Sequence, residues 1–243
     1  MPVDALFRAD PYLKNSTATV VCSGPEGIRL DRTVFYPTGG GQPGDTGILK
    51  WNGNESRIAD TRKWRRESQP EDIAHILADG SPLPPPGTPV GMILDWDRRF
   101  AHMRMHTCLH LLSALLRGAA VTGGQVGAEK SRLDFDITSA QLDKDELTAG
   151  LNKLIEGSHA VTEQWITDKE LLAKPELVRT MSVKPPMGMG RVRLLAVGDG
   201  VDLQPCGGTH VKNTSEIGPV DVIKIESKGK QNRRVVIAFR ATA

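Results

Sequence analysis

The sequence has few cysteines, few aromatic residues and almost no net charge. Of its 243 residues, 5% are aromatic and three are cysteines, at positions 22, 108 and 206. Three cysteines cannot build a disulfide framework, and so few rings make a binding surface of stacked aromatics a poor expectation. A net charge of +2, from 31 basic and 29 acidic residues, excludes a histone-like polycation.

Long apolar runs are also absent. Charges at Asp4, Arg8 and Asp10 interrupt the N-terminal segment, so it lacks the apolar core of a signal peptide. No run approaches the ~20 apolar residues that cross a bilayer. Because 39% of the residues are apolar, the chain can still bury a core. We therefore expect a soluble, cytoplasmic globular protein with no membrane partner.

The first part of the chain alternates short β-prone runs with turn residues. The runs are followed by Gly, Pro, Asn and Asp clusters, and the proline-rich segment 80–87 excludes helix and interior strand. This pattern predicts a small antiparallel sheet or barrel, which we place at residues 1–95. The expected strands are Thr17–Cys22, Arg29–Tyr36, Ile48–Trp51 and Pro89–Asp95.

The remainder, residues 96–243, changes to helical periodicity and then mixes helices with strands. Apolar residues recur every three or four positions over Asp97–Arg117, which predicts a helix, and Gly123 and Gly124 follow its end. A second helix is expected over Ser139–Glu156, with Ser139 as its cap. The expected fold is α+β, with strands at Arg132–Ile137, Ala160–Thr167, Val192–Val197, Pro219–Glu226 and Arg234–Phe239.

Two pairs of metal-ligating residues stand out. His106 and His110 lie four residues apart in the first predicted helix, which places both imidazoles on one face. Cys206 and His210 follow with the same spacing around Gly207 and Gly208, which let the backbone turn tightly. One thiolate and three imidazoles form a ligand set that suits one Zn²⁺ ion.

Each pair taken alone is more often a packed or surface feature than a metal site. The two pairs together favour the metal interpretation. Thr107 stands where a zinc peptidase of the H-E-x-x-H type has its glutamate, so that class is excluded. We expect Cys108, on another face of the helix, to be packed in the interior.

The glycine-rich segment Tyr36–Gly47 formally contains the G-x-G-x-x-G pattern of dinucleotide-binding proteins. That pattern requires a helix at the loop, whereas this segment precedes the strand-like Ile48–Trp51. No nucleotide cofactor is therefore expected. Two alternatives stay open: a wide turn between strands, or a loop whose bare backbone N–H groups contact a substrate.

Four ordered motifs over nearly the whole chain resemble one family closely. The motifs F-Y-P-T-G-G-G-Q-P-G-D-T-G, D-W-D-R-R-x₃-M-R-x-H-T-x₂-H-L-L, S-R-L-D-F-D and C-G-G-T-H are similar to those of the AlaX proteins, free-standing relatives of the alanyl-tRNA synthetase editing domain. The resemblance is to the medium-length form. It implies a small antiparallel β-barrel followed by an α+β, zinc-containing editing domain of the threonyl/alanyl-tRNA synthetase type.

The resemblance implies hydrolysis of mischarged tRNA(Ala), chiefly Ser-tRNA(Ala), with Gly-tRNA(Ala) as a second substrate. It implies one Zn²⁺ held by His106, His110, Cys206 and His210, and a catalytic role for Gln125 of the Q-V-G motif. The candidate substrate-binding residues are Thr122, close to Gln125, and five residues of the glycine motif, Thr38, Gly39, Gly40, Gly41 and Gln42.

Local clusters of basic residues are the candidate tRNA contacts. Residues 224–240 hold six basic residues and one acidic residue, and from these we select Lys228, Lys230, Arg233 and Arg234. Two further clusters are Arg57, Arg62, Lys63, Arg65 and Arg66, and Arg98, Arg99 and Arg104.

Two other functions fit the same residues. One is a zinc-stabilised tRNA-binding module without activity of its own. The other is a deacylase for another small-amino-acid ester such as Thr-tRNA.

Overall fold

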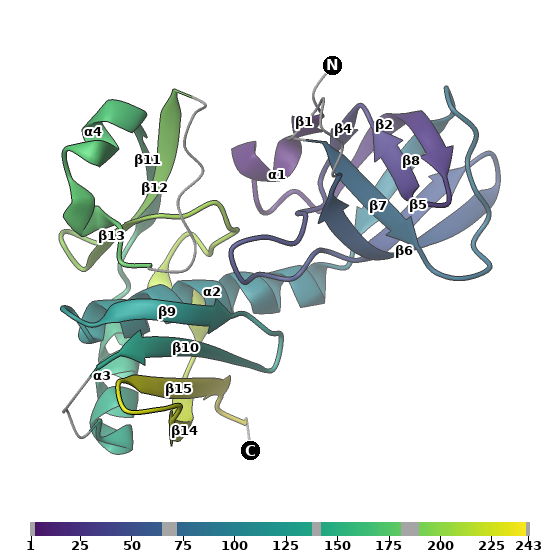
Figure 1. Ribbon diagram of the computed structural model, residues 1–243. Helices are drawn as coiled ribbons and strands as arrows, with labels where there is room; N and C mark the ends of the chain where they lie inside the picture. Colours follow the sequence, from purple (N-terminus) through teal and green to yellow (C-terminus); the bar gives the residue numbers. More distant parts are fainter. Residues whose placement is uncertain (1–2, 65–71, 138–141, 181–189, 242–243) are drawn as a thin grey trace. The chain divides into compact units, whose positions relative to one another are not determined.

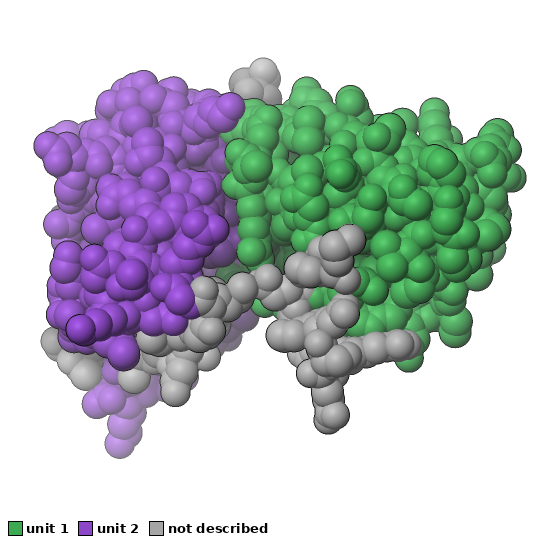
Figure 2. Space-filling model, turned by 90° about the horizontal axis from the view of Figure 1, so that it is seen from above, with its two compact units in different colours: residues 1–100 green, residues 101–243 purple. Residues whose placement is uncertain are grey.

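The structure is a computed structural model that describes residues 3–64, 72–137, 142–180 and 190–241. The chain divides into two compact units, residues 1–100 and residues 101–243, which Figure 2 shows in two colours.

The N-terminal unit is built around a closed antiparallel barrel. Around the barrel the strands follow the order β2-β3-β7-β6-β5-β8 (Figure 1). Two short strands, β1 (Asp4–Ala5) and β4 (Arg32–Thr33), pair in parallel beside it, and α1 (Leu6–Ala9) follows β1. The barrel strands are β2 (Asn15–Gly24), β3 (Gly27–Leu30), β5 (Gly47–Trp51), β6 (Asn54–Lys63), β7 (Ile73–Leu77) and β8 (Pro89–Leu94).

The barrel is closed around aliphatic side chains, which alternate with more exposed residues along β5 and β8. The hairpin β5–β6 turns at Asn52 and Gly53, both at positive φ, which is the sequence that two-residue hairpins favour. The core consists of Ala18, Val20, Ile28, Leu30, Val34, Phe35, Leu49, Ile58, Val90, Met92 and Leu94.

Two barrel strands, β6 and β7, were not predicted from the sequence. In β6 the buried positions include the polar residues Ser56 and Thr61, and β7 buries His75. The expected run Arg29–Tyr36 is also not one strand, because the chain turns after Leu30 and only Arg32–Thr33 pairs again. The buried polar side chains in these strands have hydrogen-bond partners in other segments of the same unit.

The C-terminal unit contains two antiparallel sheets. One has the order β14-β15-β10-β9 and the other β11-β12-β13 (Figure 1). The helix α4 (Asp168–Leu172) follows β11 and is capped reciprocally by Thr167 and Glu170, while the 3-10 turns 175–177 and 214–217 connect strands. The strands are β9 (Ala120–Gln125), β10 (Lys130–Asp136), β11 (Val161–Thr167), β12 (Arg191–Val197), β13 (Asp202–Pro205), β14 (Val220–Ser227) and β15 (Asn232–Phe239).

The helix α3 (Lys144–Glu156) covers the edge of the four-stranded sheet. Its Asn152 side chain donates to the carbonyl of Val220 (2.8 Å) and accepts from the N–H of the same residue (3.0 Å). The expected start of this helix was wrong: it begins at Lys144, and Asp143 caps it by accepting from two backbone N–H groups. Ser139 lies outside the described residues.

The long helix α2 (Trp96–Leu115) begins in the N-terminal unit and ends in the C-terminal unit. The two glycines expected after this helix do follow it, and they lie in the strand β9. Among the residues that the structure describes, no helix is long and apolar enough to cross a membrane. The expected α+β fold with an N-terminal antiparallel barrel is confirmed.

Candidate metal centre and its surroundings

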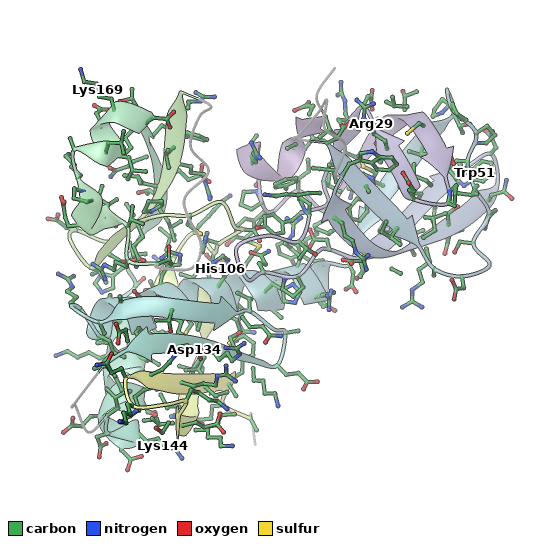
Figure 3. All side chains as sticks on the ribbon, in the orientation of Figure 1. Arg29, Trp51, His106, Asp134, Lys144 and Lys169 are labelled. Carbon is green, nitrogen blue, oxygen red and sulfur yellow. The ribbon has the colours of Figure 1, made fainter. Side chains whose placement is uncertain are left out.

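The buried face of α2 carries two of the four candidate ligands. His106 and His110 are 7% and 8% exposed, and their ring centroids lie 5.5 Å apart. Met103 and Leu111 on the same helix are fully buried, so this part of α2 lies in the interior of the unit. Figure 3 labels His106 on α2. A spacing of four residues therefore stacks the two imidazoles one turn apart, as expected.

The other two candidate ligands lie on the turn that follows β13. The guanidinium of Arg193 in β12 donates to the carbonyls of Cys206 (2.7 Å) and Gly208 (2.9 Å). The same guanidinium is paired with Glu163 at 2.6 Å. Two charge-assisted hydrogen bonds to one turn fix its backbone, and with it the position of the Cys206 thiol.

These residues meet in one cluster. One ligand atom from each of His106, His110, Cys206 and His210 lies within 4.8 Å of the others. The Cys206 Sγ lies 3.2 Å from His210 Nε2 and 3.6 Å from His106 Nε2. Ligands at about 2.0–2.3 Å from one tetrahedral zinc ion lie about 3.3–3.6 Å from one another. The cluster therefore has the size and the donor chemistry of a zinc site.

A carboxylate fixes the orientation of one imidazole. His110 Nδ1 lies 2.9 Å from Asp202 Oδ2. Because a carboxylate accepts and does not donate, Nδ1 carries the proton and Nε2 is directed to the cluster.

A hydroxyl orients a second imidazole. Thr107 Oγ1 donates to the carbonyl of Met103 (2.9 Å) and accepts from the N–H of Val211 (3.3 Å). It therefore accepts again from His210 Nδ1 at 3.2 Å, which leaves Nε2 of His210 as the ligand atom beside the thiol.

The charges in the cluster favour metal binding. Burial alone would raise the pKa of the Cys206 thiol, but the imidazoles of His106 and His210 outweigh burial and hold this pKa well below its usual range. Burial lowers the pKa of His210 well below its usual range, which favours the neutral imidazole that ligates a metal. A thiolate and a neutral imidazole are the forms that bind zinc.

The pKa values of His110 and Cys108 are raised, whereas those of Cys206 and His210 are lowered. Burial alone would lower the pKa of His110, but its hydrogen bond to Asp202 and the neighbouring Cys206 raise it to about 10. A metal ion at Nε2 would therefore displace a proton. Cys108 is fully buried, and burial raises the pKa of its thiol to about 12, which agrees with a packed residue.

The glycine-rich segment belongs to the N-terminal unit and forms a tight turn. Gly39 and Gln42 exchange two backbone hydrogen bonds of 3.0 Å, and Gly40 and Gly41 between them have φ of 58° and 82°. Positive φ at both central positions is the geometry of a type I′ turn, which glycine adopts without strain. Gly40 and Gly41 are exposed, whereas the Gln42 side chain is buried.

The Thr38 side chain and Gly44 fasten this turn to the neighbouring strand β6. Thr38 Oγ1 accepts from the N–H of Gly44 (2.9 Å), and the N–H of Thr38 donates to the carbonyl of Thr61 (2.9 Å). A Cβ atom at Gly44 would lie 2.1 Å from that carbonyl oxygen, so only glycine fits there. Thr38 thus has a structural role in the turn, while the backbone of Gly40 and Gly41 stays accessible.

The candidates Thr122 and Gln125 lie on β9, in the same unit as the cluster. Gln125 is exposed, and its Oε1 accepts from Arg132 Nε at 3.4 Å. Thr122 Oγ1 accepts from Asn232 Nδ2 at 3.2 Å. β9 forms an edge of the four-stranded sheet, and the N–H of Val121 donates to the carbonyl of Arg179 (2.8 Å).

The candidate tRNA contacts divide into exposed and paired residues. Lys230 is exposed, and the exposed Lys228 pairs with Glu226 at 3.4 Å. Arg233 donates to Ser227 Oγ (3.1 Å), and Arg234 is paired with Asp134, which Figure 3 labels. The side chain of Arg234 is thus held within the sheet by a carboxylate.

The third basic cluster lies partly in the interior of the protein. Arg99 is fully buried and paired with Asp45, and Arg98 donates to the carbonyl of Gly44 at 3.4 Å. Arg104 donates to the carbonyl of Ile217 (2.8 Å) and lies over the ring of Phe239. The interpretation as a phosphate contact is wrong for Arg99, because a helical residue in a run of basic residues can point into the interior. Arg98 and Arg104 are half-buried.

In the second basic cluster, Arg62 pairs with Asp60 at 2.6 Å, and Arg57 and Lys63 are exposed. Arg65 and Arg66 lie outside the described residues.

Sequence reasoning missed Asp202, Thr107 and Arg193, which support the cluster. Asp202 and Gln204 alternate in a short strand just before the C-G-G-T-H motif, and both are buried. Polar residues at the inward positions of a strand beside metal-ligating residues are the signal that could have identified them.

Comparison with known proteins identifies the class. Residues 192–236, which contain Cys206 and His210, match the family described as the threonyl and alanyl tRNA synthetase second additional domain. Residues 5–97 match the family of class II (A) tRNA synthetases. The barrel and the His/Cys cluster thus define a protein of the tRNA synthetase editing-domain class.

Individual relatives define the family more narrowly. The chain is 37% identical over 239 residues to the alanyl-tRNA editing protein AlaX-M of Methanosarcina barkeri, with 96% of this chain and 97% of the relative covered. It is 34% identical to AlaX-L of Pyrococcus horikoshii, over 96% of this chain and 57% of that protein. It is 35% identical to the alanine–tRNA ligase of Thermococcus kodakarensis, over 96% of this chain and 25% of the ligase. The chain belongs to the AlaX family of alanyl-tRNA editing proteins.

Proposed function

We propose that this protein is a trans-editing hydrolase that deacylates mischarged tRNA(Ala), chiefly Ser-tRNA(Ala) and also Gly-tRNA(Ala), in the cytoplasm. The observation that carries the proposal is the buried cluster of His106, His110, Cys206 and His210, in which partners outside the cluster direct two Nε2 atoms inward. The relatives that match over nearly their whole length are named alanyl-tRNA editing proteins. An enzyme with that role hydrolyses the ester between the amino acid and the tRNA.

The four residues of the cluster are the proposed ligands of one zinc ion. A thiolate with a lowered pKa and three imidazoles suit zinc better than the hard cations, which prefer oxygen ligands. With all four side chains bound, zinc would only stabilise the local structure. With one coordination position open, it would polarise the ester or a water molecule as a Lewis acid.

The proposed catalytic residue is Gln125. An aminoacyl ester is already activated, so its hydrolysis requires positioning and hydrogen bonds more than a strong nucleophile. The exposed side-chain amide of Gln125 can donate to the ester carbonyl and accept from the attacking water. Thr122, three residues earlier on β9, is the proposed contact for the amino acid.

The exposed turn of the N-terminal unit is the second proposed substrate contact. Its backbone N–H groups at Gly40 and Gly41 are accessible to a ribose, phosphate or carbonyl oxygen. Thr38, Gly39 and Gln42 hold the turn in place through the hydrogen bonds described above. We propose that residues 1–95 and 96–243 form two separate domains, a β-barrel domain and an editing domain.

The proposed selection of serine over alanine requires a buried polar group that bonds the seryl hydroxyl. A buried group placed to bond the seryl hydroxyl is left unpaired when an alanyl ester binds. That difference can reject the alanyl ester by a factor of about 10⁴ or more. Glycine, which is smaller than alanine, is not excluded by size.

The hairpin β14–β15 provides the proposed tRNA contacts. Lys228 and Lys230 are exposed at its turn, and Arg233 lies beside them. Arg234 contributes less charge to a ligand because Asp134 accepts from its guanidinium at 2.8 and 2.9 Å.

A deacylation assay tests the proposal. Purified protein is mixed with tRNA(Ala) charged with serine, glycine or alanine, with and without a zinc chelator. We expect rapid release of serine, release of glycine, slow release of alanine, and loss of activity with the chelator that added zinc restores. Equal rates for serine and alanine would contradict the proposed selectivity, and full activity without zinc would contradict the role of the metal.

A further inference from the structure

Asp202 is the centre of a buried hydrogen-bond network behind the metal cluster. It is 3% exposed and accepts from His110 Nδ1 at 2.9 Å. Gln204 Nε2 donates to both of its carboxylate oxygens, at 2.8 and 2.9 Å, and Arg179 Nη1 lies 3.4 Å from Oδ1. The carboxylate is therefore held by three donors from three segments of the chain.

The donors that hold Asp202 are themselves fixed to α2. Gln204 Nε2 lies 3.2 Å from Ser113 Oγ, and Arg179 Nη1 donates to the carbonyl of Ser113 at 3.2 Å. Ser113 follows His110 by three residues, so the network returns to the helix that carries the ligand. This closed arrangement allows the carboxylate little freedom to move away from His110.

The two oriented imidazoles have partners of different charge. His210 donates to the neutral hydroxyl of Thr107, whereas His110 donates to a carboxylate. A carboxylate partner raises the basicity of a ligating imidazole and fixes its tautomer more strongly than a hydroxyl does. Of these two imidazoles, His110 is the one held by a charged partner.

The same network reaches the strand that carries the candidate substrate contacts. The carbonyl of Arg179 accepts from the N–H of Val121 in β9 at 2.8 Å, while its guanidinium contacts Asp202. Thr122 is the next residue on that strand. Arg179 therefore contacts both Asp202, the partner of His110, and the strand β9.

We infer that Asp202 is a positioning residue for the metal site: it holds His110 as the Nδ1–H tautomer with Nε2 directed to the ion, and Gln204 and Arg179 hold Asp202. The inference rests on the proposal that the cluster binds zinc. Loss of such a partner of a ligating histidine weakens metal affinity about 10- to 100-fold.

The test compares the zinc affinity of the wild type with that of Asp202→Asn and Asp202→Ala, by competition with a chromogenic chelator. Asp202→Asn keeps the shape and removes the charge, and Asp202→Ala removes both. The matched control is Asp134→Asn, because Asp134 is also a buried carboxylate held by arginines but belongs to another network. We expect at least tenfold weaker zinc binding for both Asp202 variants and unchanged binding for the control.

Two additions keep the test decisive. The visible absorption spectrum of the Co²⁺-loaded protein reports ligand geometry, and we expect it to shift in Asp202→Asn but not in Asp134→Asn. Arg179→Gln, at a partly exposed side chain, serves if the Asp202 variants do not fold, with an expected smaller loss of affinity.

The outcomes distinguish a failure of the proposed zinc site from a failure of the proposed role of Asp202. A wild type that binds no zinc contradicts the proposed metal site. A wild type that binds one zinc tightly, with Asp202→Asn or Arg179→Gln binding it equally tightly, overturns the positioning role of Asp202 alone.

Discussion

Arg99 and Asp45 form an ion pair in which neither side chain is more than 1% exposed. The Arg99 guanidinium also donates to the carbonyls of Pro11 (2.8 Å) and Val34 (2.6 Å), and Asp45 accepts from the N–H of Tyr36 at 2.5 Å. The pair thus connects the start of α2 to the segments on both sides of the glycine-rich turn. A buried charge whose partner is removed is costly, because its desolvation is no longer compensated.

Replacing Arg99 by methionine is therefore expected to destabilise the protein strongly. The variant leaves Asp45 buried without its partner, and such a loss costs about 3–5 kcal/mol. Urea unfolding followed by circular dichroism measures the change. Arg57→Ala, at an exposed residue of the same unit, is the control and should change the free energy of unfolding by about 0.5 kcal/mol or less. Equal stability of the two variants would contradict the structural role of Arg99.

His75 makes the stability of the barrel depend on pH. It is fully buried, its Nδ1 lies 2.9 Å from the carbonyl of Ile28, and its Nε2 lies 2.8 Å from Thr33 Oγ1. The neutral ring satisfies both contacts by donating from Nδ1 and accepting at Nε2. Burial lowers the pKa of His75 to about 4.

Since this pKa is lower in the folded state than the 6.5 of an unfolded chain, the unfolded state takes up the proton first as the pH falls. The contribution of His75 to stability is thus present above pH 6.5 and is lost as the pH falls toward 4. Between pH 7 and pH 5 the loss is about 2 kcal/mol. Urea unfolding at both pH values should show a smaller pH effect for His75→Met than for the wild type. A variant with the same pH dependence as the wild type would show that His75 does not titrate in this way.

The sequence predicted which residues form the His/Cys cluster better than it predicted their environment. The two spacings of four residues identified His106, His110, Cys206 and His210, because local periodicity determines which side chains share a face. Asp202, Arg179 and Gln204 were not identified, because their role depends on contacts with α2, which lies far away in the chain. Arg99 was misinterpreted for the same reason, since its partner lies 54 residues away.

The two cysteines of the C-terminal unit provide a matched pair for the metal site. Cys206→Ser removes the thiolate of the cluster, whereas Cys108→Ser changes a buried thiol outside it. We expect Cys206→Ser to lose most of its zinc after dialysis and Cys108→Ser to retain one ion per chain, as measured by atomic emission. Zinc retained by Cys206→Ser as well as by the wild type would contradict the proposed ligand set.

The lowered pKa of Cys206 makes a prediction for the metal-free protein. Only a thiolate reacts with iodoacetamide, and an ordinary thiol has a pKa of about 8.5. Alkylation of Cys206 in chelator-treated protein should therefore persist at pH 6, where a cysteine-containing model peptide reacts little. Peptide mass spectrometry distinguishes the sites, and Cys108 should stay unmodified while the protein is folded. Alkylation of Cys206 that falls with pH as in the peptide would contradict the lowered pKa.

Lys228 and Lys230 are expected to contribute to tRNA affinity. Each phosphate contact contributes about 0.7–0.9 to the slope of log K against log salt concentration. The double variant Lys228→Ala, Lys230→Ala should bind tRNA more weakly with a slope lower by about 1–2, as filter binding at several salt concentrations would show. Lys153→Ala, Lys169→Ala removes two exposed charges on α3 and α4 and is the control. The same slope in both double variants would exclude the β14–β15 hairpin as the contact.

Gly40 distinguishes the two interpretations of the glycine-rich turn. It has a φ of 58°, and a Cβ atom added there meets no heavy atom within 4 Å, so Gly40→Ala strains the backbone by about 1 kcal/mol without a clash. Gly53→Ala in the β5–β6 hairpin is the matched control, with a φ of 75° and equally open space. If the turn contacts the substrate, Gly40→Ala should lower kcat/KM for Ser-tRNA(Ala) well below that of Gly53→Ala at similar stability. Equal kcat/KM values would show that the turn has only a structural role, because the added methyl group then meets nothing in the complex.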